Sequence, residues 1–213
     1  MGKQSAAIPS NWPSNLPYLA QPTYAPHVSK AQIAALKIRP SDLAEEVPSN
    51  LPRGPSAAVK ITPISNPAHP ANGQAGLFAA RALPAGSLIL PYYGVVHSAS
   101  PPHSLEHERS DYDLWLDREA EVAVDADRAG NEARFVNDYR GVRDRPNAEF
   151  REAWDPRAGQ KCMAVFVLPA GKNTARGKGK GKGDGGIAKG EEICVSYGKG
   201  FWEKRKTEEE EAG

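Results

Sequence analysis

From Val59 onward, the chain alternates short apolar runs with glycine and proline. The runs are rich in β-branched and aromatic residues, and turn-forming residues bound them. They read AVKI, GLFAA, SLILPYYGVV, DLWL, EVAV, CMAVFVL and EEICVSYG. Their irregular spacing disfavours a repeat array or an alternating βαβ sheet. The pattern predicts a mostly β domain over about residues 57–202, with little helix except at GNEARFVN.

The first seventy residues have a different texture, because twelve of the nineteen prolines lie there and interrupt regular structure. One exception is SKAQIAALKI, where Ser29 is a predicted N-cap. Ile33, Leu36 and Ile38 then lie near one face of a helix that ends before Pro40. We therefore expect a Pro-rich N-terminal extension over residues 1–56, with one short helix that docks on the following domain.

Two charged segments are expected outside the core. The segment GKNTARGKGKGKGDGG holds five basic residues against one aspartate, with glycine at nearly every other place. Such a sequence cannot bury enough apolar surface to order itself, so it predicts a flexible basic insertion over 170–186. The ending EKRKTEEEEAG predicts a charged tail over 203–213, with helix at its start.

Overall charge is balanced, since 27 Lys and Arg face 26 Asp and Glu for a net charge of +1. This balance excludes a uniformly basic or acidic electrostatic binder. The basic insertion could still contact nucleic acid or an acidic chromatin surface. A solvated insertion is the preferred interpretation, because no aromatic residues are interleaved with its lysines.

Cysteine content and hydropathy indicate the cellular setting of the protein and argue against metal and membrane binding. Two cysteines, Cys162 and Cys194, are too few for a four-cysteine zinc site or a disulfide scaffold, so we expect a reducing, intracellular setting and no metal. The nucleus is slightly favoured over the cytoplasm. No run approaches the roughly 20 apolar residues of a spanning helix, so no membrane partner is expected. The histidines His97, His103 and His107 lie in a Pro- and Ser-rich stretch, which predicts an exposed loop.

Three motifs follow one another in a fixed order. The first has glycines before a strand, a polar turn and a second strand that ends in two tyrosines. The second is an aspartate-rich strand end followed by an asparagine block. The third is a turn that leads into a strand with a terminal tyrosine and two nearby aromatics. They read GQAGLFAARALPAGSLILPYYG, VAVDADRAGNEARFVN and AKGEEICVSYGKGFW. Each alone is compatible with plain structure, since glycine and asparagine suit turns.

Together the motifs resemble the SET domain, the fold of protein lysine methyltransferases, over roughly residues 57–202. The resemblance implies short twisted strands in small sheets, with a knot-like threading of the C-terminal segment. It also implies S-adenosylmethionine as cofactor and a protein lysine, in a histone or another protein, as methyl acceptor. The cysteine-rich flanks that bind zinc in many histone-directed members are missing, so we expect other segments, including the N-terminal region, to complete the substrate channel.

Family roles carry over to matching positions. The implied cofactor-binding residues are Gly76, Leu77, Tyr112, Arg134, Asn137 and Asp138. The implied catalytic residues are Tyr197 and Tyr112. The implied substrate channel is walled by Tyr93, Val195, Phe201 and Trp202. Two positions depart from the family pattern: Gln74 stands in the place of the first motif glycine unless Gly73 shifts in, and Asp138 stands where family members usually have histidine.

Lysine methylation explains the residue types that these motifs supply. A lysine ammonium, with an ordinary pKa near 10.4, has no free lone pair at neutral pH, so the site must favour the neutral amine. A narrow apolar and aromatic channel does this by desolvation, and Tyr197 would orient the amine. The alternative is a catalytically inactive SET-like protein-binding module, suggested by the DYR sequence that begins at Asp138.

Overall fold

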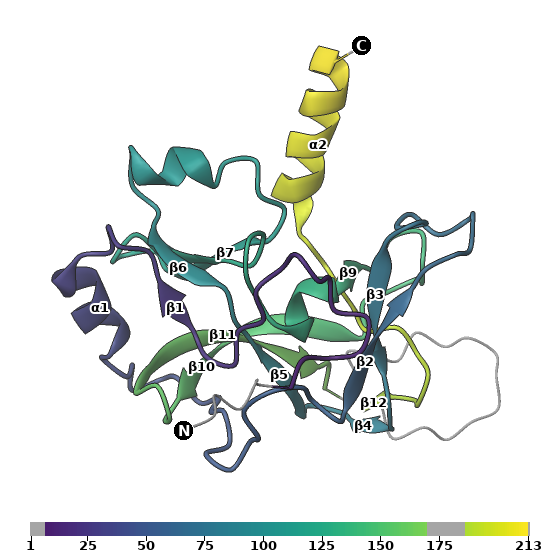
Figure 1. Cartoon of the computed structure of the whole chain (residues 1–213), viewed down its shortest axis with the longest axis horizontal. Helices are drawn as coiled ribbons and strands as arrows, with labels where there is room; N and C mark the ends of the chain where they lie inside the picture. Colours follow the sequence, from purple (N-terminus) through teal and green to yellow (C-terminus); the bar gives the residue numbers. More distant parts are fainter. Residues whose placement is uncertain (1–6, 170–185, 213) are drawn as a thin grey trace.

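The computed structural model describes residues 7–169 and 186–212. These residues form short strands in several small sheets, with little helix, so the predicted mostly β class is confirmed (Figure 1). The strands are β1 (Thr23–Tyr24), β2 (Val59–Pro63), β3 (Ala75–Ala79), β4 (Leu83–Pro84), β5 (Leu88–Tyr92), β6 (Val95–Ser98), β7 (Asp113–Asp117), β8 (Val122–Asp125), β9 (Asn137–Asp138), β10 (Ala148–Asp155), β11 (Gln160–Val167), β12 (Gly186–Ile187) and β13 (Cys194–Val195). The helices are α1 (Lys30–Leu36) and α2 (Lys199–Ala212), and the 3-10 turns are η1 (His103–Glu106) and η2 (Glu132–Phe135).

Each predicted apolar run contains a strand, and GNEARFVN contains the 3-10 turn η2. The longest strand outside the prediction is β10, which pairs antiparallel with β11 along its whole length. Its sequence AEFREAWD mixes charged with apolar residues, and it lies at the edge of the sheet β10-β11-β5. Charged residues are common on edge strands, where they discourage association with other chains. The pattern of apolar runs therefore did not reveal β10.

Two sheets hold most of the core. One has the order β1-β6-β8-β7, and the other has the order β10-β11-β5. The strand β8 is buried at every position, and β11 at nearly every one, as expected for strands covered on both faces. The hairpin of β2 and β3 supplies Ile61 and Leu77 to the same core. These layers form the rigid frame from which the loops of the site extend.

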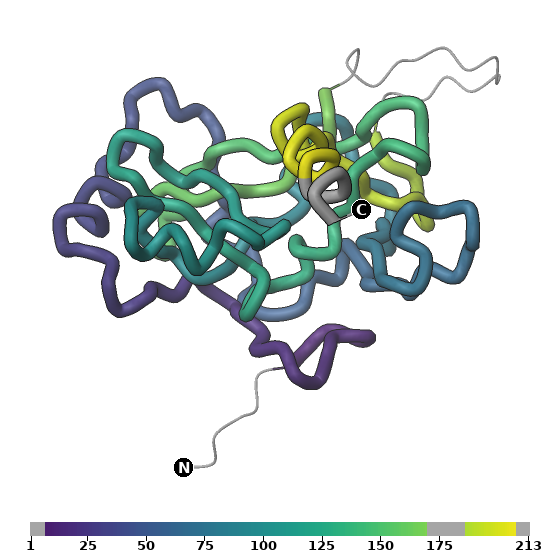
Figure 2. The backbone as a smooth tube through the Cα atoms, turned by 90° about the horizontal axis from the view of Figure 1, so that it is seen from above, coloured from purple at the N-terminus to yellow at the C-terminus, as the bar shows by residue number. Residues whose placement is uncertain are grey.

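The N-terminal extension packs into this core. Helix α1 begins at the predicted cap, where the Ser29 hydroxyl accepts from the amide of Gln32 and the Gln32 side chain accepts from the amide of Ser29. Leu36 is fully buried in the main core cluster, which also holds Trp12. Ile38 was predicted on the same face, but it lies beyond the helix end and is 69% exposed. Figure 2 shows the purple N-terminal segment running along the outer edge of the domain.

Strand pairing brings distant parts of the chain together near the C-terminus. β9 and β13 pair in parallel, with Asn137 opposite Cys194 and Asp138 opposite Val195. The knot-like threading implied by the resemblance stays a prediction, and this pairing is the part of the arrangement that the structure shows. Helix α2 follows and projects from the domain (Figure 1). It spans residue 202, where the domain was predicted to end.

The predicted basic insertion over 170–186 lies outside the described residues except for Gly186, which begins β12. Within the described part of the chain, neither helix has the length and apolar character needed to cross a bilayer.

Burial of Leu36 generates a first prediction. The substitution Leu36→Ala should lower the free energy of unfolding by about 2–5 kcal/mol, because it leaves a cavity in the main core. The matched control Ile38→Ala, two residues away and exposed, should change it by less than about 0.5 kcal/mol. Urea unfolding followed by circular dichroism measures both values. Equal effects of the two substitutions would show that the extension is not part of the folded core.

Candidate active site

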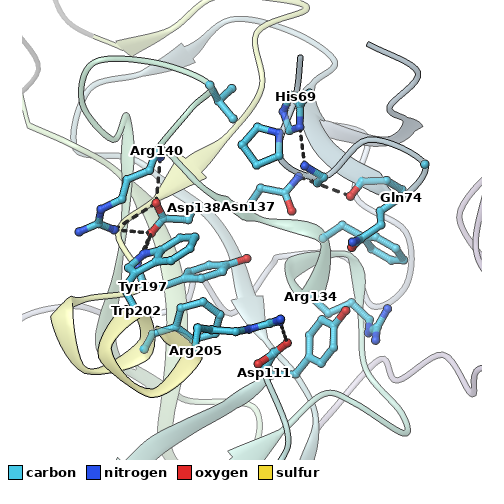
Figure 3. Close-up of a pocket in the computed structure, with 18 of the residues that line it drawn as sticks. His69, Gln74, Asp111, Arg134, Asn137, Asp138, Arg140, Tyr197, Trp202 and Arg205 are labelled. Atoms are coloured by element: carbon cyan, nitrogen blue, oxygen red, sulfur yellow. Dashed lines mark hydrogen bonds and ion pairs between the residues drawn. The ribbon is translucent and has the colours of Figure 1, made fainter. Parts of the chain in front are cut away.

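A cavity of about 820 Å³ opens where five separate segments of the chain meet. Figure 3 shows the side chains that surround it. The lining comes from the N-terminal extension, from the end of β2 and the loop between β2 and β3, from the residues just before β7, from the stretch around η2 and β9, and from the residues after β13. The lining residues are Asn11, Pro13, Pro63, His69, Pro70, Ala71, Gly73, Gln74, Ala75, Asp111, Tyr112, Arg134, Phe135, Asn137, Asp138, Arg140, Val142, Tyr197, Phe201, Trp202, Arg205 and Lys206.

The phenol of Tyr197 is held in a fixed orientation. Its hydroxyl donates to the carbonyl of Val136 at 2.8 Å, and its ring meets the edge of Phe201 at a centroid distance of 4.8 Å. Burial raises the pKa of Tyr197 above its ordinary value, with smaller contributions from nearby Tyr112 and Asp138. The phenol therefore stays neutral at physiological pH. Because its proton is given to a carbonyl, its oxygen lone pairs remain available to accept a hydrogen bond.

Asp138 organises the backbone around Tyr197. One carboxylate oxygen accepts from the amide of Tyr197 at 2.8 Å and from the indole of Trp202 at 3.3 Å. The same carboxylate pairs with the Arg140 guanidinium at 2.9 Å and accepts from the Arg140 amide. The Asp138 side chain is only 6% exposed. A buried carboxylate is tolerated when it is paired and hydrogen-bonded, and Asp138 meets both conditions.

Tyr112 and Arg134 form a second wall. The Arg134 guanidinium lies over the ring of Tyr112, 4.2 Å from its centroid, and its Nε donates to the carbonyl of Ala126. The hydroxyl of buried Tyr92 donates to the backbone carbonyl of Tyr112, which fixes the loop that carries this ring. A cation stacked on an aromatic face adds about 0.5–2 kcal/mol and sets the plane of both groups.

Asn137, the first residue of β9, also lines the cavity. Its amide nitrogen donates to Glu192 at 2.8 Å, and Glu192 also pairs with His69 at 3.0 Å. Sequence reasoning did not single out His69 or Glu192. Their separation of 123 residues leaves no local spacing signal, although Glu192 lies in the third motif, two residues before β13.

Four predicted site residues do not line the cavity. Leu77 is fully buried in the core, and Val195 is fully buried beside β9. Gly76 lies against the side chains of Glu192 and Asn137 and does not line the cavity. Gly73 and Gln74 do line it. Tyr93 needs the clearest correction.

The hydroxyl of Tyr93 donates to Asp155 at 3.1 Å and accepts from Arg157 at 2.7 Å, away from the cavity. Successive residues of an extended segment point to opposite sides, so Tyr92 points toward the backbone of Tyr112 in the core, whereas Tyr93 points toward Asp155. The remaining predicted residues, Tyr112, Arg134, Asn137, Asp138, Tyr197, Phe201 and Trp202, all line the cavity.

The histidines predicted in an exposed loop are instead packed. His97 is 1% exposed in β6, bonds to Asp113 at 2.8 Å and stacks on His107 at 3.5 Å. His103 stacks on His27 of the N-terminal extension. Across residues 7–169 and 186–212 no group of three or more His, Cys, Asp or Glu is arranged to hold a metal ion.

Comparison with known proteins agrees with the motif order. Residues 74–170 match the family profile of the SET domain. This segment of the chain corresponds to a SET domain. Members of this family are typically protein lysine methyltransferases, and SET domains bind S-adenosylmethionine. The profile ends before Tyr197, so the third motif lies outside the matched residues. No curated protein matches the chain.

Several solved structures of polycomb repressive complex 2 from Chaetomium thermophilum are similar. A humanized mutant bound to the inhibitor GSK343 has 22% identity and a TM-score of 0.49, covering 72% of this chain and 17% of that chain. An autoinhibited form bound to S-adenosylmethionine has 22% identity and a TM-score of 0.47, covering 71% and 17%. A complex with H3K27me3 and H3K27M has 23% identity and a TM-score of 0.48, covering 69% and 15%. The chain therefore spans less than a fifth of the length of these relatives.

The bonds of Asp138 generate a prediction about stability. In Asp138→Asn one acceptor oxygen becomes a donor that faces other donors, so the free energy of unfolding should fall by about 1–3 kcal/mol. The matched control is Asp144→Asn, an exposed aspartate in the following loop, which should change it by less than about 0.5 kcal/mol. Thermal and urea unfolding of both variants provide the measurement. Indistinguishable unfolding midpoints would contradict the organising role of this carboxylate.

Proposed function

We propose that this protein transfers a methyl group from S-adenosylmethionine to a lysine side chain of another protein. The observation that carries the proposal is the meeting of Tyr112, Arg134, Asn137 and Tyr197 at one cavity. These residues come from separate segments of the chain, and the bond from Tyr197 to the Val136 carbonyl alone joins positions 61 apart.

The cavity residues fit the chemistry of this cofactor. The volume of the cavity lies within the roughly 300–1,000 Å³ that is typical of small-molecule sites. Arg134 can pair with a carboxylate, and the Asn137 oxygen can accept from an N–H group of the cofactor, whose reactive centre is a sulfonium. When bound, the cofactor supplies an electrophilic methyl group on that sulfonium. Gln74 and Asn11 add further polar groups to the same wall.

The protein's own residues prepare the lysine. Tyr112, Phe201 and Trp202 give the cavity aromatic surface, which disfavours an ammonium by desolvation. The ammonium proton would leave to water, and the neutral amine would then be the nucleophile toward the methyl group that the bound cofactor would supply.

Tyr197 orients that amine. Its raised pKa makes the phenol unsuitable as a base at neutral pH, so its role is to accept an N–H hydrogen bond through its oxygen. The bond from its hydroxyl to Val136 fixes the direction of those lone pairs before substrate arrives. Preorganised groups of this kind lower the barrier because they need no rearrangement during transfer. The acceptor is a lysine in a histone or another protein, and Trp202, which lines the cavity and is 37% exposed, is the residue that we expect to contact the substrate peptide.

A rival function is a SET-like binding module without catalysis, for which the replacement of the usual histidine by Asp138 is the specific observation. Isothermal titration calorimetry separates the two. Heat of binding with S-adenosylmethionine supports the enzyme, whereas its absence in folded protein supports the binding module.

The assigned role of Tyr197 gives a direct test. Tyr197→Phe should lower kcat about 100-fold or more, because the oriented oxygen is lost. Cofactor affinity should stay within about twofold, since the ring remains. Transfer of labelled methyl groups to a histone mixture and a cell extract, with mass spectrometry of the modified residue, provides the assay.

The control for this test is Tyr139→Phe, which removes a phenol oxygen from a neighbouring tyrosine that does not line the cavity. Its turnover should match that of the unmodified protein. Full turnover in Tyr197→Phe would refute the role assigned to the phenol.

A further inference from the structure

Three side chains from distant segments form a continuous chain of hydrogen bonds behind the cavity. His69 Nε2 and Glu192 Oε2 are 3.0 Å apart, and Glu192 Oε1 is 2.8 Å from Asn137 Nδ2. The side chains of His69 and Glu192 are only 10% and 9% exposed. Figure 3 shows His69 and Asn137 on the same wall of the cavity. His69 and Asn137 are thus linked through Glu192 alone.

The neighbours of His69 fix its protons. Its Nδ1 accepts from the amide of Ala71 at 3.0 Å, so this nitrogen carries a lone pair. The proton of the neutral ring must then be on Nε2, which donates to the carboxylate of Glu192. The turn between β2 and β3 therefore presents a defined donor to Glu192.

The neighbours of Asn137 fix its amide in the same way. Its nitrogen faces Glu192 Oε1 and, at 3.4 Å, the carbonyl of Ala75, and neither of these groups can donate. The amide oxygen must therefore point away from Glu192. Within the described part of the chain this oxygen has no hydrogen-bond partner, and Figure 3 shows it turned toward the cavity. The wall presents an acceptor at this point, which suits an N–H group of a ligand.

Gly76 makes room for this arrangement. A Cβ placed on Gly76 would lie 2.6 Å from Glu192 Oε1 and 3.0 Å from Asn137 Nδ2. Real Cβ atoms do not approach other atoms so closely, so any larger residue would push the carboxylate away from the amide. The motif glycine is thus explained by the Glu192–Asn137 bond.

His69 supplies the second anchor that Glu192 needs. The terminal torsion of a glutamate is broad, so a carboxylate held at one oxygen can rotate away from its partner. With Oε2 held by His69, Oε1 stays directed at Asn137. We propose that His69 is a positioning residue for cofactor binding, which acts through Glu192 to keep the Asn137 oxygen toward the cavity. This inference rests on the proposed function for the identity of the ligand, but the hydrogen-bond chain itself does not.

A first experiment needs no ligand. In full-length ¹⁵N-labelled protein, the side-chain amide signal of Asn137 is assigned by its loss in Asn137→Ala. In His69→Ala this signal should shift and its exchange with water should become faster, because Glu192 is released. His69→Gln, which keeps an N–H donor directed at Glu192, should restore both properties. An Asn137 signal unchanged in His69→Ala would overturn the inference.

A second experiment measures the consequence for binding. Calorimetric titration with S-adenosylmethionine should show about 10-fold weaker binding in His69→Ala, the change expected for one lost hydrogen bond to a charged group. His69→Gln should recover most of the affinity. The control His103→Ala, in η1 and away from the cavity, should bind like the unmodified protein.

A mutant cycle separates positioning from general structural damage. In an Asn137→Ala background, His69→Ala should cause no further loss of affinity, because the group that it positions is absent. Additive losses would overturn the inference. In transfer assays His69→Ala should raise KM for the cofactor and leave kcat within about twofold. If the unmodified protein binds no cofactor while the Asn137 signal responds to His69, the proposed function fails and the hydrogen-bond chain stands.

Discussion

The parallel pairing of β9 with β13 is the contact on which the site depends. It covers only two residues of each strand, so its own backbone bonds are too few to hold it. Fully buried Asn147 reinforces it. The Asn147 amide nitrogen donates to the carbonyl of Glu192, its oxygen accepts from the amide of Cys194, and its backbone amide donates to the carbonyl of Cys194. One asparagine thus fixes the segment that carries both Glu192 and Tyr197.

Asp138 fixes the residues that follow β13, as Asn147 fixes the residues before and within it. The strand pairing ends at Val195. Beyond it, the carboxylate of Asp138 holds the chain by accepting hydrogen bonds from the Tyr197 amide and the Trp202 indole. Arg140 neutralises this carboxylate, and its guanidinium also lies 5.5 Å from the Trp202 ring centroid. A histidine could not accept three donors at once, so the departure from the usual family residue coincides with a different network around α2.

The sequence could predict those parts of the structure whose signal is local. Apolar runs located most strands, Ser29 located the start of α1, and motif order located Asn137 and Tyr197. It could not predict β10, whose charged residues at a sheet edge do not look like a buried strand. It also misplaced Tyr93, because a pair of adjacent tyrosines does not reveal the direction in which either side chain points.

His69 and His97 show a second limit of prediction from the sequence. Both lie in Pro-rich or Ser-rich stretches that look like exposed loops, yet both are buried against carboxylates, Glu192 and Asp113 respectively. Each of these histidines is paired with an acid that is distant in the sequence, and this distance hides the acid from sequence reasoning. The missed residues are therefore those whose role depends on contacts across 16 to 123 positions.

The N-terminal extension forms part of the cavity wall in a chain whose sequence lacks cysteine-rich zinc-binding flanks. Asn11 and Pro13 line the cavity, and the residue between them, Trp12, is 8% exposed. Its ring meets Tyr18 and Phe135 edge-on, and its indole donates to the carbonyl of Leu16. Asn11 adopts φ of 63°, a conformation that asparagine tolerates better than most residues, and its side chain donates to Ile61. Hydrophobic burial of Trp12 at one end and of Leu36 at the other thus holds this wall against the domain.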